Sequence, residues 1–384
     1  MRKHREPPEV ELRKPIPVFR PWVDEEEVQA AREVILSGWM GLGPKTEEFE
    51  RKFAEFIGAK FAVGTNSCSS ALHLALVVCG TEGREVISPS LSFVSTNHAI
   101  LWSGGVPVFA DVDEETLTLD VEDVARKITP NTRAIIAMHY GGHPCDMDGL
   151  KALTKGKDIL IVEDAAHACG SEYKGRKAGT LGDIACFSFH AVKNLTTGEG
   201  GMVVTDSQEV RDRLVRLRWL GITKSTWTRS AEKKGDYSWY YDVAELGYKY
   251  HMSDLAAAIG LVQLKKLAES NRLRRIIVAK YNEAFAGLPW LKTPVELPHV
   301  KSANHNYVVK AERREEFIEH LKKRGVSASV HYVPNHHYAI FEDFSKDVPT
   351  TEKVWKKLVT LPLYPGLSDS DISLVIDAVR SFSP

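Results

Sequence analysis

A regular alternation of short apolar runs with amphipathic stretches, over the first two-thirds of the chain, most constrains the fold. Several of the apolar runs have no polar face, which is typical of parallel strands covered by helices on both sides. Strands are predicted at 60–63, 85–88, 106–109, 133–138, 158–163, 184–189 and 201–205. Helices are predicted at 25–37, 45–57, 69–79 and 93–102. The pattern indicates an open α/β sheet, and such sheets bind ligands at the carboxyl ends of their strands.

The pattern changes after residue 253. Residues 254–286 are predicted to form one or two helices, and a proline-marked stretch follows. A strand, a helix and a second strand are predicted over 306–312, 314–325 and 327–333, and a last helix over 369–382. We therefore expect a large α/β domain at 1–260, with an amino-terminal arm of about residues 1–20, and a smaller α+β domain at 261–384.

Composition excludes several classes of protein. The chain has 50 Lys and Arg against 51 Asp and Glu, so nucleic acid is not expected as a bulk electrostatic partner. No apolar run approaches the roughly 20 residues that span a bilayer, and the charged start lacks the apolar core of a signal peptide. The five cysteines are scattered without a C-x-x-C pair, which favours a reducing cytoplasm over a disulfide framework or a cysteine zinc site.

A predicted strand that ends in two acidic residues is the first candidate for a chemical site. In IVEDAAHA, residues 161–168, Glu163 and Asp164 close the strand and His167 follows. A carboxylate at this position would keep the pyridine nitrogen of pyridoxal phosphate protonated, which makes the ring an electron sink. An aspartate after a strand is also a common helix cap, so the motif by itself leaves both interpretations open.

A lysine in a glycine-rich corner is the second candidate. In FSFHAVKNLTTGEGG, residues 187–201, a strand leads through Ser188 and His190 to Lys193 and then to a loop too rich in glycine for a helix. A lysine must be neutral to attack a carbonyl, and burial lowers its pKa in that direction. Lys193 is therefore a candidate for a Schiff base, with a solvated surface lysine as the alternative.

Two further segments would face the same strand ends. In VGTNSCSSALHLAL, residues 63–76, small polar residues open a helix, whose free N–H groups and dipole favour an anion. A plain helix cap is the alternative. Phe93 follows another predicted strand and would stack on a pyridine ring, although a phenylalanine is more often part of the core.

The ordered set of motifs resembles the DegT/DnrJ/EryC1/StrS family of sugar aminotransferases. The set comprises Asp-x-x-His at 164–167, Ser-Phe-His-x-x-Lys at 188–193 followed by Gly-Glu-Gly-Gly, and LPLYPGLSDSDISLVIDAV at 361–379. The resemblance covers nearly the whole chain. It implies an aspartate-aminotransferase-like fold (fold type I), with a large mixed, mostly parallel sheet domain and a small carboxyl-terminal α+β domain. It also implies a homodimer whose subunits share their active sites.

The resemblance implies a role for each matching residue. Lys193 is the lysine of the internal aldimine, Asp164 faces the pyridine nitrogen and His167 lies beside the ring hydroxyl. A serine hydroxyl and two backbone groups at the phosphate, and an aromatic side chain on the ring, complete the cofactor contacts: Ser188, Cys68, Ser69 and Phe93.

Two positions depart from the family pattern. Cys68 stands where the family has a glycine in its phosphate turn. The segment 247–260 matches the part that reaches across the dimer toward the partner's phosphate, and His251 stands there where the family has an asparagine. Lys193 is not replaced by histidine, which argues against the branch that removes a sugar hydroxyl.

The implied reaction is a ping-pong transfer of an amino group from L-glutamate to a nucleotide-linked keto sugar, in cell-surface polysaccharide biosynthesis. FSFHAVKN and GYKY are closest to members that act on UDP-linked 4-keto sugars. One alternative keeps pyridoxal phosphate and changes the reaction to that of a lyase or a desulfurase, although a desulfurase needs a mobile catalytic cysteine. A non-catalytic sensor that binds the cofactor is another.

A histidine-rich segment and an aromatic segment remain. In SVHYVPNHHYAIF, the histidines at 331, 336 and 337 resemble a metal cluster, but no carboxylate or cysteine completes the spacing, so no metal is expected. We expect His331, Tyr332 and His336 to contact the substrate, with plain surface histidines as the alternative. Residues 222–242 are expected to grip the nucleotide of the substrate, with these candidates: Lys224, Trp227, Arg229 and Tyr240.

Overall fold

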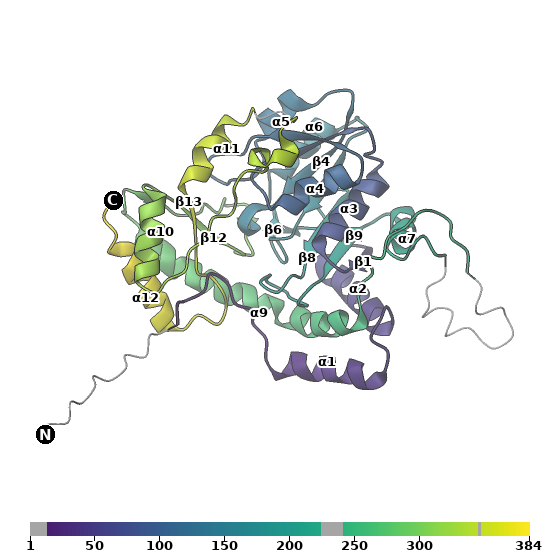
Figure 1. Ribbon diagram of the computed structural model, residues 1–384, viewed down its shortest axis with the longest axis horizontal. Helices are drawn as coiled ribbons and strands as arrows, with labels where there is room; N and C mark the ends of the chain where they lie inside the picture. Colours follow the sequence, from purple (N-terminus) through teal and green to yellow (C-terminus); the bar gives the residue numbers. More distant parts are fainter. Residues whose placement is uncertain (1–13, 224–240, 345–346) are drawn as a thin grey trace, which may run out of the picture.

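A seven-stranded sheet forms the centre of the protein in the computed structural model, which describes residues 14–223, 241–344 and 347–384 (Figure 1). The strand order across the sheet is β1-β9-β8-β5-β4-β2-β3. All seven predicted strands are confirmed: β1 (Phe61–Thr65), β2 (Glu85–Pro89), β3 (Val106–Ala110), β4 (Thr132–Met138), β5 (Leu160–Asp164), β8 (Ile184–Ser188) and β9 (Gly201–Thr205).

The strand directions place the ends of several strands at one edge of the sheet. Strands β3, β2, β4, β5 and β8 run parallel, whereas β9 is antiparallel to both of its neighbours, β8 and β1. The carboxyl ends of β1, β2, β4, β5 and β8 therefore lie at one edge, together with the start of β9. This is the edge at which an α/β sheet binds ligands.

Helices cover both faces of the sheet. On one face, α2 (Pro44–Ile57) and the start of α9 (Asp254–Phe285) pack on alternate strand residues such as Ile135 and Phe187. On the other face, α3 (Cys68–Cys79) and α7 (Gln208–Leu217) pack on the intervening residues, such as Ile136 and Cys186. The protein therefore has the predicted α/β fold, with a mixed, mostly parallel sheet between two helical layers.

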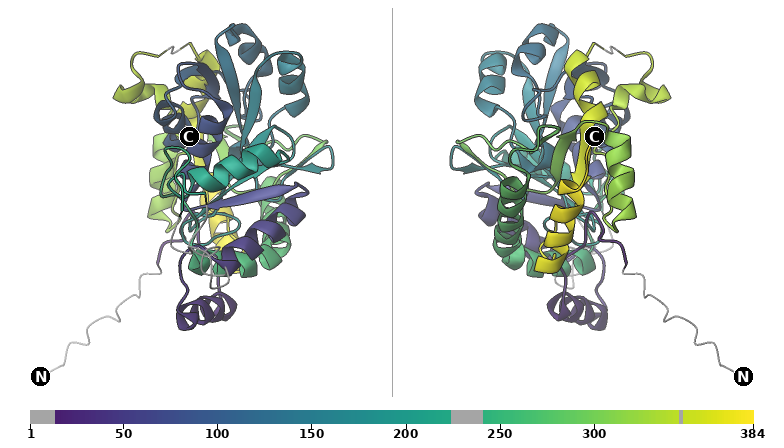
Figure 2. Two further views of the ribbon diagram at one scale, coloured as in Figure 1. Left: turned by 90° about the vertical axis from the view of Figure 1, so that its right-hand side faces the viewer. Right: turned by 90° about the vertical axis from the view of Figure 1, so that its left-hand side faces the viewer.

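The predicted helices of the first part are confirmed, and their ends follow from local chemistry. Helix α1 (Glu25–Ser37) begins with a capping box between Asp24 and Glu27 and ends at Gly38, whose φ of 77° is left-handed. Figures 1 and 2 show α1 at the outer margin of the molecule beside α9. The other helices of this part are α4 (Val94–Trp102), α5 (Val121–Lys127), α6 (Met147–Thr154) and the 3₁₀ turn Tyr140–Gly142.

A second hydrophobic core lies around the later part of α9, which is one continuous helix of 32 residues. Its sheet, β10-β12-β13, is antiparallel throughout. The elements of this region are β10 (Leu291–Lys292), β12 (Tyr307–Ala311), α10 (Arg314–Lys323), α11 (Pro349–Val354), β13 (Leu358–Leu361) and α12 (Asp369–Arg380), with 3₁₀ turns at Asn335–His337, Ala339–Phe341 and Trp355–Lys357. A further small sheet contains β6 (Glu172–Tyr173), β7 (Arg176–Lys177) and β11 (Val300–Lys301).

The prediction of a strand at 327–333 was wrong. The neighbours of β12 are β10 and β13, and among the described residues the 327–333 segment contributes an isolated bridge from Ser329 to Thr360. Nδ1 of His331 still lies 2.8 Å from Oγ1 of Thr360 in β13, but the next residue turns to the loop after β5: the hydroxyl of Tyr332 lies 3.0 Å from Nε2 of His167. This segment therefore joins the second core to the edge of the large sheet.

The amino-terminal arm also joins the two cores. Ile16 packs in the second core and forms a bridge with Val326, and its N–H donates to the carbonyl of Gly325 at 2.9 Å. The arm then passes the large sheet before α1 begins. Among the described residues, no helix has the length and apolar character needed to cross a bilayer.

Candidate active site

A cavity of about 620 Å³ opens at the carboxyl edge of the large sheet. Its wall comes from strand ends, from the starts of α3 and α4, from the second core and from the amino-terminal arm. It brings together nine of the residues predicted for the site: Cys68, Ser69, Phe93, Asp164, His167, Ser188, Lys193, His331 and Tyr332.

Asp164 closes β5 and faces this cavity, while its neighbour Glu163 points to the opposite side of the sheet. Asp164 is 3% exposed; it accepts hydrogen bonds from Thr96 Oγ1 at 2.7 Å and from the N–H of Ala166 at 3.2 Å. Burial raises the pKa of the Asp164 carboxyl, and a cationic ligand nitrogen would lower it again. Asp164 can therefore hold a proton on a ring nitrogen in the cavity.

Glu163 anchors the loop before β8. Its two oxygens accept from the N–H groups of Gly179, Leu181 and Gly182 at 2.6–2.8 Å and from Nε2 of His139 at 2.9 Å. Burial raises the pKa of Glu163, but these hydrogen bonds outweigh burial and lower it. Because successive side chains of a strand point to opposite faces, Asp164 lies in the cavity and Glu163 in the core, and the two adjacent acids have different roles.

Replacing Glu163 by glutamine is expected to reduce the free energy of unfolding by about 3 kcal/mol, because the amide nitrogen would face buried donors. Glu163 contributes stability above its unfolded pKa of about 4.3, and this contribution is lost as pH falls through the lower folded value. The difference in the free energy of unfolding between the parent and E163Q, measured with urea, should therefore become smaller below about pH 4. E82Q, at an exposed glutamate, should stay within about 0.5 kcal/mol of the parent; an E163Q protein of parental stability would contradict this role.

Lys193 reaches the cavity from the loop between β8 and β9. Burial lowers the pKa of its amine to about 8, against the opposing effect of Cys68 and Asp164. Its Nζ lies 3.3 Å from Nε2 of His305, whose Nδ1 lies 3.0 Å from Oδ1 of Asn194. Because this amide oxygen accepts, Nδ1 carries the proton of His305 and Nε2 accepts from Lys193.

His167 and Tyr332 form the wall beside Lys193. Nδ1 of His167 accepts from the N–H of Gly141 at 3.3 Å, so Nε2 carries the proton and faces the Tyr332 hydroxyl. Burial lowers the pKa of His167 well below its usual range, and the Lys193 charge adds to this effect. The His167 ring is therefore a neutral group with a fixed tautomer.

The start of α3 supplies an anion site. Ser67 caps the helix by accepting from the N–H of Ser70, and the first helical N–H groups, at Cys68 and Ser69, have no acceptor within the helix. Gly201, at the start of β9, allows the backbone of β9 to lie against the start of α3, because a Cβ at this position would lie 2.4 Å from the carbonyl oxygen of Ser67. Ser188 lines the same cavity, so a phosphate would find a hydroxyl and backbone donors together.

The residues present fit pyridoxal phosphate. A buried amine, a buried carboxylate and an anion site lie in one cavity that has room for a flat six-membered ring. Phe93 also lines it, with its ring centroid 6.0 Å from that of Tyr332 and a side chain that is 55% exposed. An exposed aromatic ring at a cavity mouth is available for stacking on such a ligand.

Sequence reasoning missed several wall residues, and three of them contact the predicted site residues or one another. Thr96 binds Asp164, His305 binds Lys193, and the ring of Phe19 stacks on His305 with a centroid distance of 5.5 Å. No local pattern marks these residues, since each acts on a site residue at least 68 positions away.

Two predicted site residues do not line the cavity. His251 forms a bridge with Thr65 and packs on Trp219, and its buried Nδ1 finds no hydrogen-bond partner among the described residues. His336 lies in a cluster with His337 and Glu352, so the expectation that no carboxylate joins these histidines was wrong. Sequence analysis missed Glu352 because it lies 16 positions after His336, on helix α11, and only the fold brings the two side chains together. The candidates Lys224, Trp227, Arg229 and Tyr240 lie outside the described residues.

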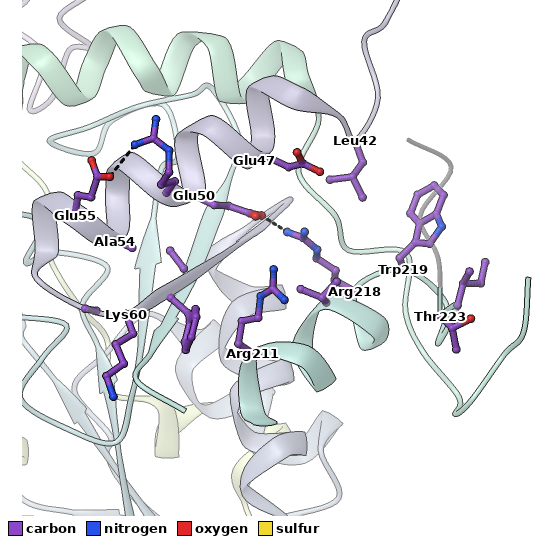
Figure 3. A pocket seen from close by; sticks show the side chains of 16 residues that line it. Leu42, Glu47, Glu50, Ala54, Glu55, Lys60, Arg211, Arg218, Trp219 and Thr223 are labelled. Atoms are coloured by element: carbon purple, nitrogen blue, oxygen red, sulfur yellow. Dashed lines mark hydrogen bonds and ion pairs between the residues drawn. The ribbon is translucent and has the colours of Figure 1, made fainter. Parts of the chain in front are cut away.

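A second cavity, of about 760 Å³, is larger but lacks this chemistry (Figure 3). It lies between α2, β1 and the end of α7, and four of its charged side chains form two ion pairs, Arg218 with Glu50 and Arg51 with Glu55. None of the residues predicted to bind the cofactor is among the described residues that line it, whereas Ile222 and Thr223, of the 222–242 segment expected to grip the nucleotide, are. Volume alone therefore does not mark the active site.

A mostly parallel sheet that gathers a buried lysine, a buried aspartate and a helix amino terminus in one cavity defines a pyridoxal phosphate enzyme of fold type I. The family model described as the DegT/DnrJ/EryC1/StrS aminotransferase family matches residues 21–380. The chain belongs to this family, and it is a pyridoxal phosphate-dependent sugar aminotransferase.

Individual relatives agree with this assignment. The chain is 41% identical to the spore coat polysaccharide biosynthesis protein SpsC of Bacillus subtilis, over 95% of this chain and 96% of SpsC. Among solved structures it matches the aminotransferase TlmJ of Streptoalloteichus hindustanus, with a TM-score of 0.89, 36% identity and coverage of 96% and 98% of the two chains. It also matches the PLP form of the sugar aminotransferase Spr1654 of Streptococcus pneumoniae, described as putative, with a TM-score of 0.88, 30% identity and coverage of 96% and 98%.

Proposed function

We propose that the enzyme transfers an amino group from L-glutamate to a nucleotide-linked keto sugar, and that its acceptor is a UDP-linked 4-keto sugar. The observation that carries the aminotransferase chemistry is the common cavity of Lys193 and Asp164. The relationship to SpsC supports a place in polysaccharide biosynthesis. The motifs FSFHAVKN and GYKY support the choice of acceptor.

Lys193 is the group that would bind the cofactor and move protons. When bound, pyridoxal phosphate supplies a reactive carbonyl and an electron-accepting ring. Because burial lowers the pKa of Lys193 to about 8, a useful fraction of the amine is neutral near neutral pH. Once free, Nζ would take the proton from the α-carbon of the amino donor and return a proton in the second half-reaction, with His305 as the acceptor that positions it.

The remaining side chains would orient the cofactor and exclude water. Asp164 would hold a proton on the ring nitrogen, and Thr96 fixes the orientation of its carboxylate. The start of α3 and Ser188 would bind the phosphate, while His167 and Phe93 would enclose the ring. Asp164, His167 and Ser188 are buried, whereas Phe93 is exposed at the cavity mouth, so the cofactor would be held by rigid groups on the inner wall and covered by Phe93 on the outside.

The desulfurase alternative is disfavoured by the state of the cysteines. All five are buried, and Cys68 lies on the cavity wall. Burial raises the pKa of the thiols of Cys68 and Cys186 well above the usual value, and of Cys79 and Cys169 to about 12. A desulfurase requires a thiolate nucleophile, and burial opposes it. A non-catalytic sensor would not need the arrangement around Lys193.

The proposed reaction can be tested with purified enzyme, pyridoxal phosphate, L-glutamate and a panel of UDP- and dTDP-linked 3-keto and 4-keto sugars. Mass spectrometry should show the largest product, an amino sugar nucleotide, with a UDP-linked 4-keto sugar. An amino sugar made only from dTDP-linked or 3-keto acceptors would contradict the choice of substrate. Glutamate that produces no 2-oxoglutarate with any acceptor would contradict the choice of donor.

We also propose a cytoplasmic homodimer that shares its active sites, with a large domain at 1–260 and a small domain at 261–384. Apolar side chains on α1 support the dimer: Val28, Ile35 and Leu36 are 57%, 54% and 68% exposed. Leu246 is 89% exposed and directly precedes the segment 247–260, which we expect to reach toward the partner. Apolar surface of this kind is commonly covered by a second subunit.

The double variant V28E/I35E is expected to shift the protein from dimer to monomer. These residues are seven positions apart, on one face of α1, so two carboxylates would be buried in the proposed interface. Light scattering after size exclusion should report half the parental mass, with loss of activity at low protein concentration. V295E, at another exposed valine, should remain dimeric. A V28E/I35E protein of unchanged mass would place the interface elsewhere.

A further inference from the structure

A cluster of two histidines and a glutamate lies outside the active-site cavity. His336 and His337 come from a 3₁₀ turn and Glu352 from α11, and one ligand atom from each lies within 4.8 Å of the others. Nε2 of His336 is 2.6 Å from Oε1 of Glu352, and Nε2 of His337 hydrogen-bonds to the same oxygen. We call this set the His–His–Glu cluster.

Neighbouring groups orient the ligand atoms. Nδ1 of His336 lies 2.6 Å from Oγ of Ser90, which also accepts from the N–H of His336 at 3.2 Å. Without a metal, Nε2 of His336 donates to Glu352, and Nδ1 accepts from the Ser90 hydroxyl. When Nε2 gives up its proton its lone pair faces the cluster, and Ser90 Oγ can then accept from a proton on Nδ1. Oε2 of Glu352 accepts from the indole N–H of Trp355 at 3.4 Å. Outer hydrogen bonds of this kind hold metal-binding histidines and carboxylates in position.

The chemistry of the cluster suits a transition metal. Two imidazole nitrogens and one carboxylate oxygen are the protein ligands of an open, four-coordinate Zn²⁺ site. His336 is 5% exposed, whereas His337 and Glu352 reach the surface, so an ion has an entry path and water can take the fourth position. Oε1 of Glu352 accepts from both imidazoles, so a carboxylate oxygen already lies between the two histidine nitrogens.

We propose that the His–His–Glu cluster binds one Zn²⁺ ion per chain and that the ion joins the 331–338 segment to α11. Zn²⁺ takes the place of the Nε2 protons that His336 and His337 share with Oε1; each imidazole binds in its neutral form, by moving its proton to Nδ1 or, if it was charged, by releasing it to solvent. The three ligand atoms then move apart until each lies about 2.0–2.2 Å from the metal. The same segment carries Tyr332 into the active site, and Asn335 binds Asn97 of α4. The ion therefore stabilises the wall of the active site from outside and takes no part in the transfer reaction.

Metal binding can be measured on the cofactor-loaded enzyme after treatment with a chelator. Calorimetric titration with ZnCl₂ should show one tight site per chain, and Zn²⁺ should raise the midpoint of thermal unfolding. H337A and E352Q each remove one ligand and should weaken binding at least about tenfold. H299N, at an exposed histidine outside the cluster, should bind Zn²⁺ like the parent.

Cobalt provides a direct readout of the ligands. Co²⁺ in the parent should give visible d–d bands at longer wavelengths than the absorbance of pyridoxal phosphate, and H337A should lose them. Folding of each variant is checked by thermal unfolding without metal. No Zn²⁺ binding at micromolar concentration, or equal binding by the parent, H337A and E352Q, would overturn the proposal.

Discussion

Replacing Lys193 by alanine is expected to lower the rate of transamination at least about 10⁴-fold. The variant loses both the amine that binds the cofactor and the group that moves the proton, and no other described lysine lines the cavity. Purified K193A should release its cofactor during gel filtration, whereas the parent should keep its absorbance. Rapid mixing with L-glutamate should show no spectral half-reaction on the timescale of the parent.

A matched lysine separates this effect from a general loss of charge. Lys174 is exposed and pairs with Asp148 on a surface turn, so K174A should retain the parental spectrum and rate. Thermal unfolding of K193A should remain close to that of the cofactor-free parent. A K193A protein that cycles with glutamate at the parental rate would remove Lys193 from the reaction.

Replacing Asp164 by asparagine is expected to reduce kcat by about 10²- to 10³-fold. The amide preserves the shape of the side chain but carries no charge, so it cannot stabilise a protonated ring nitrogen. Thr96 can still donate to the amide oxygen, and the fold should persist. Steady-state rates and the absorbance of the bound cofactor should change together, with a smaller effect on KM.

The adjacent acid supplies the control for Asp164. E163Q should lose stability, but at temperatures where it is folded its kcat should remain within a few-fold of the parent, because Glu163 faces the loop that precedes β8. D164N should show the reverse pattern. If E163Q lost kcat and D164N retained it, the assignment of the two acids to opposite sides of the sheet would be wrong.

Periodicity was sufficient to predict the large sheet. Its strands are buried on both faces, so each appears in the sequence as an apolar run between turn residues. Asp164 and Ser188 were found because they end such strands, and Lys193 because it lies in the loop after β8; the topology gathers these strand ends at one edge.

Contacts between segments that are distant in the sequence could not be predicted from local sequence patterns. Thr96, His305 and Glu352 act on residues far along the chain, and nothing in their own neighbourhoods marks them. The 327–333 segment has the composition of a strand, but its Tyr332 side chain contacts His167 in the loop after β5. Tertiary packing there overrides local preference.

The amino-terminal arm has a practical consequence for work with this enzyme. Ile16 is tied to the segment around Val326, and Val18 and Phe19 form part of the wall of the cavity. Loss of Val18 and Phe19 would remove part of that wall and widen the opening of the cavity to solvent. Kinetic comparisons should therefore use protein in which residues 14–19 are intact.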